Sequence, residues 1–232
     1  MTLVLLVRHA HSLANGSGVL AGRMDGVQLS EVGKKQAREL AGRLGEIPIK
    51  SLRSSPLERC AQTIAPWLKK AAEFDPKIKV DIDPDLSEVD YGDWTGRKLR
   101  ALSKDALWKK VQEQPSKVVF PQGESMAAMQ ERAMRALERG LTKRGKGHVI
   151  LVSHGDVLKS IIAASLNMHL DEFQRIVVDP ASISILDYSS SKPRLILMND
   201  SRSRLNPELF LDHRARLLVG GGGGVPEARR KK

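Results

Sequence analysis

Two apolar runs of the sequence each end on a histidine that stands beside groups able to bind an anion. The segment LLVRHAHS places Arg8 and His9 directly after the first run, and VILVSHGD places His154 and Gly155 directly after the second. A neutral imidazole can attack phosphorus and form a covalent intermediate. A neighbouring guanidinium can neutralise the phosphoryl oxygens in the transition state. These residue types therefore predict a site for phosphoryl transfer.

Two further segments supply groups that suit the same chemistry. Arg59 lies in SSPLERCAQT, and Glu88 lies in the acidic, glycine-bearing stretch DLSEVDYGDWTG. Two arginines and two imidazoles make a donor-rich pocket for a tetrahedral dianion. A carboxylic acid at its rim can protonate the departing oxygen. The sequence has no carboxylate cluster with magnesium-binding spacing and no P-loop, so we expect no metal, no cofactor and no nucleoside triphosphate.

These residues can meet only if the strands that precede them end at one edge of a sheet. Ligands of open parallel sheets collect at the carboxyl ends of the strands. Continuous apolar runs are typical of strands that are buried on both faces. The sequence predicts two such buried strands, at residues 3–7 and 148–155, and two further strands at 49–55 and 77–83. Two final strands at 182–188 and 194–199 are expected to form an antiparallel edge pair.

Helical patterns separate the predicted strands. Ser30 is a suitable N-cap for a first helix, and Pro56 a suitable first residue for a second. Helical periodicity returns over residues 125–143 and again over 156–168. Strands that alternate with helices indicate an α/β fold, a three-layer sandwich with a mostly parallel central sheet.

Composition narrows the function classes further. The chain has 232 residues, of which 41% are hydrophobic, and no apolar run approaches a membrane span of about 20 residues. The single cysteine, Cys60, excludes an internal disulfide. We therefore expect a cytoplasmic protein with a sizeable core and no membrane partner.

The net charge of +11 raises the question of a polyanionic partner. Part of the excess lies in residues 212–232, where five consecutive glycines precede the basic end ARRKK. This composition predicts a disordered tail after one domain that covers residues 1–211. Aromatic residues make up only 4% of the chain, which leaves few platforms for stacking bases. We therefore do not expect nucleic acid to be a partner.

At these motifs the sequence resembles the histidine phosphatase superfamily, in its phosphoglycerate mutase-like branch, over roughly residues 2–200. The resemblance rests on LVRHAHS, NGSGVLAGRMDG, SSPLERCAQT, SEVDYGDWTG and VSHGD. It implies that His9 is the phosphorylated nucleophile and Glu88 the proton donor, with Arg8, Arg59 and His154 completing the catalytic set. The residues that it implies for phosphate or substrate binding are Arg8, Asn15, Arg23, Arg59, His154 and Gly155.

Two departures bear on the activity. The family usually has glycine where this chain has Ala10, which keeps the backbone N–H but adds a methyl group. The stretch between Glu88 and His154 is shorter than in glycolytic mutases and resembles the phosphatase-like members. Parts of it look closest to actinobacterial proteins that carry a phosphomutase label.

The sequence thus predicts a metal-independent phosphomonoesterase that acts on a small phosphorylated metabolite through a phosphohistidine. A phosphomutase of the phosphoglycerate mutase type is the first alternative. A non-catalytic protein that binds phosphate or nucleic acid is the second. The family resemblance also favours a homodimer.

Overall fold

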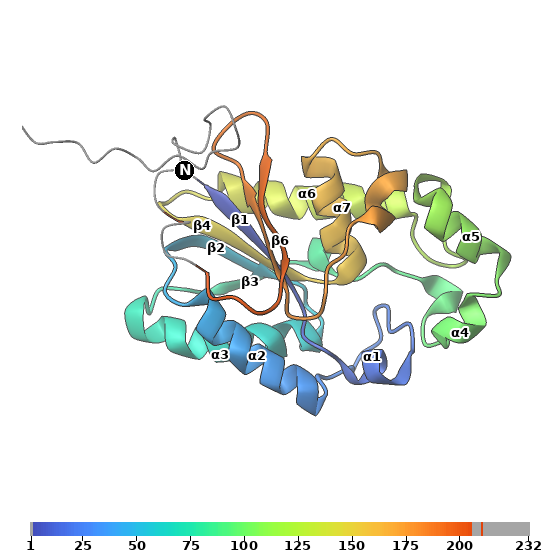
Figure 1. Ribbon diagram of the computed structural model, residues 1–232, viewed down its shortest axis with the longest axis horizontal. Helices are drawn as coiled ribbons and strands as arrows, with labels where there is room; N and C mark the ends of the chain where they lie inside the picture. Colours follow the sequence, from blue (N-terminus) through green and yellow to red (C-terminus); the bar gives the residue numbers. More distant parts are fainter. Residues whose placement is uncertain (1, 206–209, 211–232) are drawn as a thin grey trace, which may run out of the picture.

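The computed structural model describes residues 2–205 and 210, and its centre is a six-stranded sheet with the strand order β3-β2-β4-β1-β5-β6 (Figure 1). Strands β1 to β4 run parallel, whereas β5 is antiparallel to β1 and β6 to β5. The predicted α/β class and the antiparallel edge pair are therefore confirmed. The strands are β1 (Leu3–Arg8), β2 (Ile49–Ser54), β3 (Val80–Ile82), β4 (His148–Ser153), β5 (Ile183–Asp187) and β6 (Arg194–Asp200).

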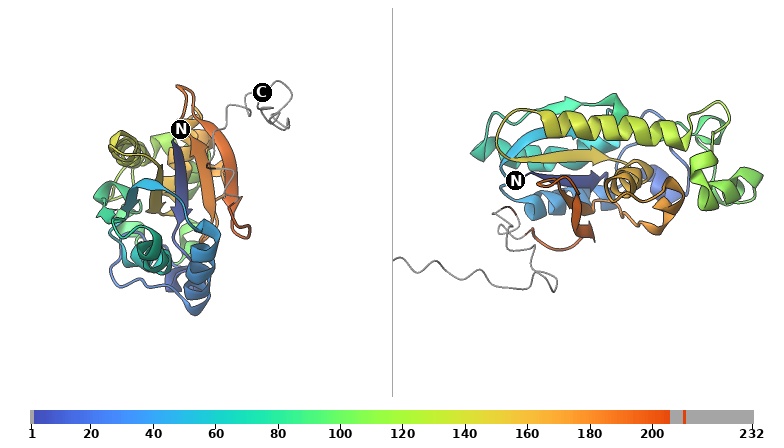
Figure 2. Two further views of the ribbon diagram at one scale, coloured as in Figure 1. Left: turned by 90° about the vertical axis from the view of Figure 1, so that its left-hand side faces the viewer. Right: turned by 90° about the horizontal axis from the view of Figure 1, so that it is seen from above.

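Helices cover both faces of the sheet (Figures 1 and 2). In β1, Leu3, Leu5 and Val7 pack in one apolar cluster with residues of α2 (Glu31–Leu44) and α3 (Glu58–Phe74). Val4 and Leu6 point the other way, into a cluster with α6 (Met126–Thr142) and α7 (Gly155–Ser165). This alternation is why the strand reads as a continuous apolar run.

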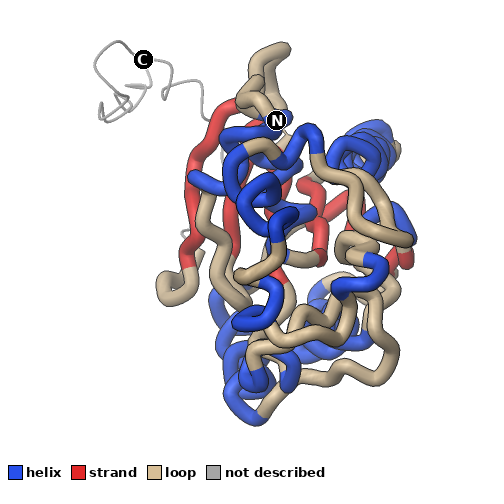
Figure 3. Tube along the Cα trace, turned by 90° about the vertical axis from the view of Figure 1, so that its right-hand side faces the viewer, coloured by secondary structure: helices blue, strands red, loops and turns tan. Residues whose placement is uncertain are grey.

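The carboxyl ends of β1, β2 and β4 lie at one end of the sheet, because these strands are parallel and in close register. Arg8 is opposite Ser153, and Ser54 is opposite Val152. Beyond this end lie α1 (Leu13–Ser17), α4 (Leu99–Leu102) and α5 (Ala106–Glu113). Figure 3 looks onto this end, where loops and short helices lie in front of the strands.

The start of α3 differs from the prediction. Pro56 is not the first helical residue, because the helix begins at Glu58 after the cap residue Leu57. Leu57 has an extended backbone, so the helix can begin only after it, and its N–H donates to the Ser55 hydroxyl at 3.3 Å instead of to a helical partner. The predicted tail at 212–232 lies outside the described residues. Within the described part, no helix is both long and apolar enough to cross a membrane.

Helix α2 approaches the chain that follows β1 so closely that one of its positions requires glycine. A Cβ atom on Gly33 would lie 2.0 Å from the carbonyl oxygen of His11, whereas a Cβ on Gly42 would have no atom within 4 Å. Both glycines lie in α2, so the two positions differ mainly in what surrounds them.

We predict opposite effects for alanine at these two positions. Gly33→Ala should lower the free energy of unfolding by about 1–3 kcal/mol, because α2 must move away from the His11 backbone. Gly42→Ala should raise it by about 0.5–1 kcal/mol, because alanine favours the helix. Urea unfolding of both variants measures the difference, and a Gly33→Ala protein as stable as the wild type would contradict the close approach.

Candidate active site

A cavity of about 430 Å³ lies at the carboxyl ends of β1 and β4 and is lined by most of the predicted site residues. Glu88 reaches it from the irregular chain that follows the single-turn helix at Pro84–Leu86. His154 is fully buried behind the wall, with its ring centroid 5.2 Å from that of His9. The predicted residues that line the cavity are Arg8, His9, Asn15, Arg59, Glu88 and Gly155.

The environment of His9 keeps its imidazole neutral and leaves Nε2 as the unprotonated nitrogen. Nδ1 lies 2.8 Å from the carbonyl oxygen of Ala10, and because a carbonyl can only accept, Nδ1 carries the proton. The lone pair therefore sits on Nε2. Burial, together with the positive charges of Arg59 and Arg8, lowers the pKa of His9 to about 3. The side chain is thus a neutral base with Nε2 available for attack on phosphorus.

Each of the two cavity arginines is held by one backbone carbonyl. Nη1 of Arg8 donates to the carbonyl oxygen of Val178 at 2.6 Å, and Nη2 of Arg59 donates to that of Gly22 at 2.8 Å. A Cβ at Gly155 would lie 3.3 Å from Cζ of Arg8, so glycine gives the guanidinium room. Gly155 also begins α7, whose first-turn N–H groups favour an anion. The arrangement can hold a phosphoryl group.

The contacts of His154 indicate which of its nitrogens carries the proton. Nε2 lies 2.8 Å from Oγ of Ser55, which already accepts the Leu57 N–H at 3.3 Å. The serine proton is therefore free to point at Nε2, and the protonated Cys60 thiol lies 3.6 Å from the same nitrogen. Both neighbours of Nε2 can donate to it, which places the imidazole proton on Nδ1. Nδ1 is buried without a partner among the described residues and lies 4.0 Å from Oε2 of Glu88. Burial and the charge of Arg59 lower the pKa of His154 well below 6.5, so the ring is a neutral donor.

The carboxyl group of Glu88 can keep a proton at neutral pH. Burial, and after it the negative charge of Asp156, raises the pKa of Glu88 to about 7, although Arg59 opposes the rise. Asp156 accepts a hydrogen bond from the Tyr91 hydroxyl at 2.8 Å and lines the same cavity. A carboxyl group with this pKa can deliver a proton and later take one back.

The structure places Asn15 and Arg23 differently from each other. Asn15 lines the cavity, and its Oδ1 accepts the Ser12 N–H at 2.9 Å in the capping box of α1. Arg23 is not among the described residues that line the cavity. Its guanidinium donates to the carbonyl oxygen of Glu88 at 2.9 Å and to Oε1 of Glu124 at 3.0 Å. Arg23 therefore contacts the backbone behind Glu88.

Sequence reasoning passed over three groups that the structure brings to the site. Ser55 lies within a motif that was used only to find Arg59, and Asp156 directly follows Gly155. The third is Arg132, whose only sequence signal was a charge within the apolar periodicity of α6.

Two features remain, the single cysteine and the residues that could bind a metal ion. The Cys60 thiol is fully buried, and burial raises its pKa to about 12, which keeps it protonated. In the ranges 2–205 and 210, no group of three or more histidine, cysteine, aspartate or glutamate residues could hold a metal ion.

Comparison with known proteins gives a family match over nearly the whole described chain. Residues 4–201 match the histidine phosphatase superfamily (branch 1). Phosphoserine phosphatase 1 of Hydrogenobacter thermophilus is 30% identical over 201 residues, which cover 86% of this chain and 92% of that protein. A "Probable phosphoglycerate mutase GpmB" of Erwinia tasmaniensis is 31% identical over 193 residues, or 82% of this chain and 87% of that one.

A solved structure of another protein has a fold similar to that of this chain over most of its length. The alpha-ribazole phosphatase of Shigella flexneri superposes with a TM-score of 0.76 at 25% sequence identity. The match covers 88% of this chain and 100% of that structure.

The contact between Ser55 and His154 leads to a prediction about phosphate binding. In Ser55→Ala the hydroxyl at 2.8 Å from Nε2 is lost and the weaker donor, the Cys60 thiol at 3.6 Å, remains. The His154 proton can then move to Nε2, and in that tautomer the ring no longer donates into the cavity. Loss of one hydrogen bond to a charged group should raise the inhibition constant of inorganic phosphate by about 10- to 100-fold. Ser55→Thr keeps the hydroxyl and serves as the control. Nitrogen-15 NMR should show the change of tautomer, and an unchanged tautomer with unchanged phosphate binding would refute this role of Ser55.

Proposed function

This chain belongs to the histidine phosphatase superfamily (branch 1), and we propose that it hydrolyses a small phosphomonoester, without a metal, through a phosphohistidine at His9. The observation that carries the proposal is a neutral His9, with Nε2 unprotonated, between Arg8 and Arg59 in one cavity with Glu88. The phosphatase and mutase relatives support an enzyme that transfers phosphoryl groups.

In the first step, Nε2 of His9 attacks phosphorus and the bond from phosphorus to the leaving oxygen breaks. Glu88 gives its proton to that oxygen, so that the leaving group departs as a neutral alcohol. Arg8, Arg59 and the Nδ1–H of His154 neutralise the charge on the phosphoryl oxygens. The Ala10 carbonyl stabilises the proton on Nδ1 of His9 as that ring becomes positively charged.

In the second step, a water molecule attacks the phosphohistidine. Glu88, now a carboxylate, takes a proton from that water, and the phosphorus–nitrogen bond breaks. The products are inorganic phosphate, a neutral His9 and a protonated Glu88, so the enzyme returns to its starting state.

The charges around the cavity favour hydrolysis over mutase activity. A mutase must retain a second anionic group of its substrate, which requires cations beyond the phosphoryl site. Among the described residues that line the cavity, Lys159 is the one cationic side chain besides Arg8 and Arg59. Its Nζ already contacts Gln174 at 2.6 Å and Asp156 at 3.4 Å. Much of the remaining wall is apolar, formed by Val19, Leu20, Leu99, Ile176, Val177 and Val178. This lining suits a leaving group without a second anion.

Several finer expectations stay predictions. They are the likeness to actinobacterial phosphomutase-labelled proteins, the homodimer, the cytoplasmic location and the low affinity for nucleic acid. The roles of Asn15 and Gly155 in phosphate binding also stay proposals, supported by their places on the cavity wall.

The first prediction of this proposal concerns the covalent intermediate. Brief exposure to phosphorus-32-labelled substrate should give an acid-labile, base-stable phosphoenzyme, because a phosphorus–nitrogen bond to histidine has that stability. His9→Ala should abolish both labelling and turnover. Undiminished labelling of His9→Ala would place the nucleophile elsewhere, and an isomerised substrate without free phosphate would favour the mutase alternative.

The second prediction concerns the proton that Glu88 donates. Glu88→Gln keeps the shape but cannot deliver a proton, so turnover of an alkyl phosphate should fall by about 10²- to 10⁴-fold. A nitrophenyl phosphate should lose much less in its single-turnover burst, because its phenolate leaves without protonation. Equal losses for both esters would mean that Glu88 only shapes the cavity.

The pH profile tests the same proton. Because the protonated form of Glu88 is the active form, kcat/KM of the wild type for the alkyl ester should fall as the pH rises through about 7. The fall should be absent from Glu88→Gln. A limb near pH 7 that persists in Glu88→Gln would assign it to another group.

A further inference from the structure

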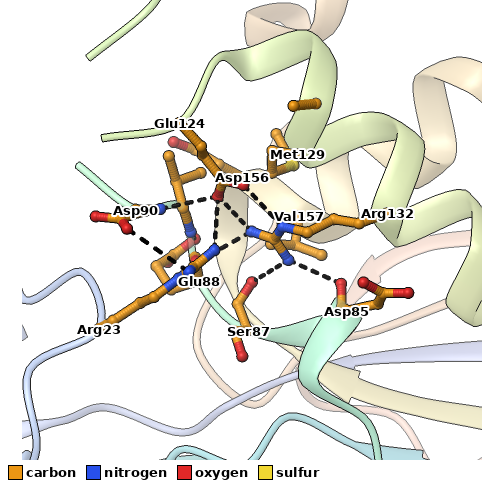
Figure 4. Close-up of polar contacts among 12 residues, drawn as sticks. Arg23, Asp85, Ser87, Glu88, Asp90, Glu124, Met129, Arg132, Asp156 and Val157 are labelled. Atoms are coloured by element: carbon orange, nitrogen blue, oxygen red, sulfur yellow. Dashed lines mark hydrogen bonds and ion pairs between the residues drawn. The ribbon is translucent and has the colours of Figure 1, made fainter. Parts of the chain in front are cut away.

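The backbone that carries Glu88 is held by one buried arginine from a distant helix. Arg132 lies on α6 and its side chain is only 8% exposed. Its Nη1 donates to the carbonyl oxygens of Asp85 at 2.8 Å and Ser87 at 2.7 Å, and its Nη2 donates to that of Glu88 at 3.1 Å. Figure 4 shows the guanidinium reaching from α6 to this segment. Three carbonyl groups in four residues therefore converge on one side chain.

Glu124 fixes the orientation of that guanidinium. Its Oε2 accepts from Nε of Arg132 at 3.0 Å, and its Oε1 accepts from Nη2 at 2.6 Å. Oε1 also accepts the backbone N–H of Asp90 at 2.9 Å. Burial opposes ionisation of Glu124, but the hydrogen bonds from Arg132 and Asp90 hold its pKa below the usual range. The charged pair thus grips the chain both before and after Glu88.

Arg23 completes the arrangement from the opposite side. Its Nε donates to the same Glu88 carbonyl oxygen at 2.9 Å, and its Nη2 donates to Oε1 of Glu124 at 3.0 Å (Figure 4). All the contacts of Arg23 and Arg132 to Glu88 are with its backbone. The carboxyl group of Glu88 lines the cavity, and its Oε1 accepts the backbone N–H of Val89 at 3.0 Å.

The hydrogen bonds of this network hold a segment that has no regular secondary structure of its own. The segment around Glu88 belongs to no strand or α-helix, so no regular hydrogen-bond ladder fixes it. A proton donor must lie within hydrogen-bond reach of the oxygen that it protonates, and a displacement of about 1 Å can cost about 10²-fold in rate. A buried ion pair is a weak source of stability but a precise geometric constraint.

We propose that the Arg132–Glu124 pair is the positioning device for the general acid. The pair touches no reacting atom and acts through the backbone of Glu88. The inference rests on the proposed function, because it assumes that Glu88 protonates the leaving group.

The test compares an alkyl phosphate with a nitrophenyl phosphate in two variants, Glu124→Gln and Arg132→Lys. Each should lower kcat for the alkyl ester by about 10- to 100-fold, because the donor is displaced. The nitrophenyl burst should change by less than about threefold, because His9 is held separately by β1. Glu113→Gln serves as the control, because Glu113 is a 59% exposed carboxylate whose partner is Lys109 on the same helix. It should leave both rates unchanged.

A double-variant cycle separates positioning from general loss of structure. In a Glu88→Gln background, Glu124→Gln should cause no further loss for the alkyl ester, because the proton is already absent. Full additivity, or equal losses for the two esters, would overturn the inference. If Arg132→Lys does not fold, the same comparison of the two esters is made with Glu124→Gln and with Arg23→Gln. Arg23 contacts the same Glu88 carbonyl and Glu124 from the more exposed side. Glu88→Gln by itself tests the proposed function. If it lowers the rates for the alkyl and nitrophenyl esters equally, Glu88 is not the proton donor, and the positioning role falls with that assignment.

Discussion

The burial of two imidazoles between two guanidinium groups is the constraint on which the rest of the site depends. A charged imidazole would be unfavourable there, so His9 and His154 are both neutral and each carries one proton. A neutral ring needs a partner that decides which nitrogen holds that proton. The Ala10 carbonyl does this for His9, and the geometry favours the Ser55 hydroxyl for His154. The electrostatics of the site therefore dictate the hydrogen bonds around it.

The nucleophile and the general acid of the proposed reaction are positioned by different kinds of structure. The nucleophile follows a strand whose neighbours on both sides hold it in register. The acid lies on irregular chain and depends on side chains from residues far away in sequence. A substitution far from the cavity can therefore disturb proton transfer without disturbing the attack on phosphorus.

Much of the framework could be predicted because it depends on local pattern. Apolar runs located β1 and β4, and the meeting of their carboxyl ends brought His9 close to His154. The function of Arg132 could not be read in the same way, because its partners include backbone carbonyls, which every residue has. Arg23 was expected near the substrate, but only the folded chain shows that Glu124 and the Glu88 carbonyl engage it. The later start of α3 likewise reflects the extended backbone of Leu57, whose N–H bonds to the Ser55 hydroxyl, and helix propensity does not include such a contact.

The carbonyl of Val178 that holds Arg8 belongs to a segment that also forms part of the apolar wall. The next residue, Asp179, is tied to Asn199 of β6 by two hydrogen bonds, of 2.6 and 2.9 Å. A leaving group that pressed on this wall would therefore also act on the guanidinium of Arg8, which in the proposed reaction binds the phosphoryl oxygens. In that reaction, binding of the alcohol and binding of the phosphate are linked through the carbonyl group of Val178. Substrate shape can in this way affect the rate of phosphoryl transfer as well as the strength of binding.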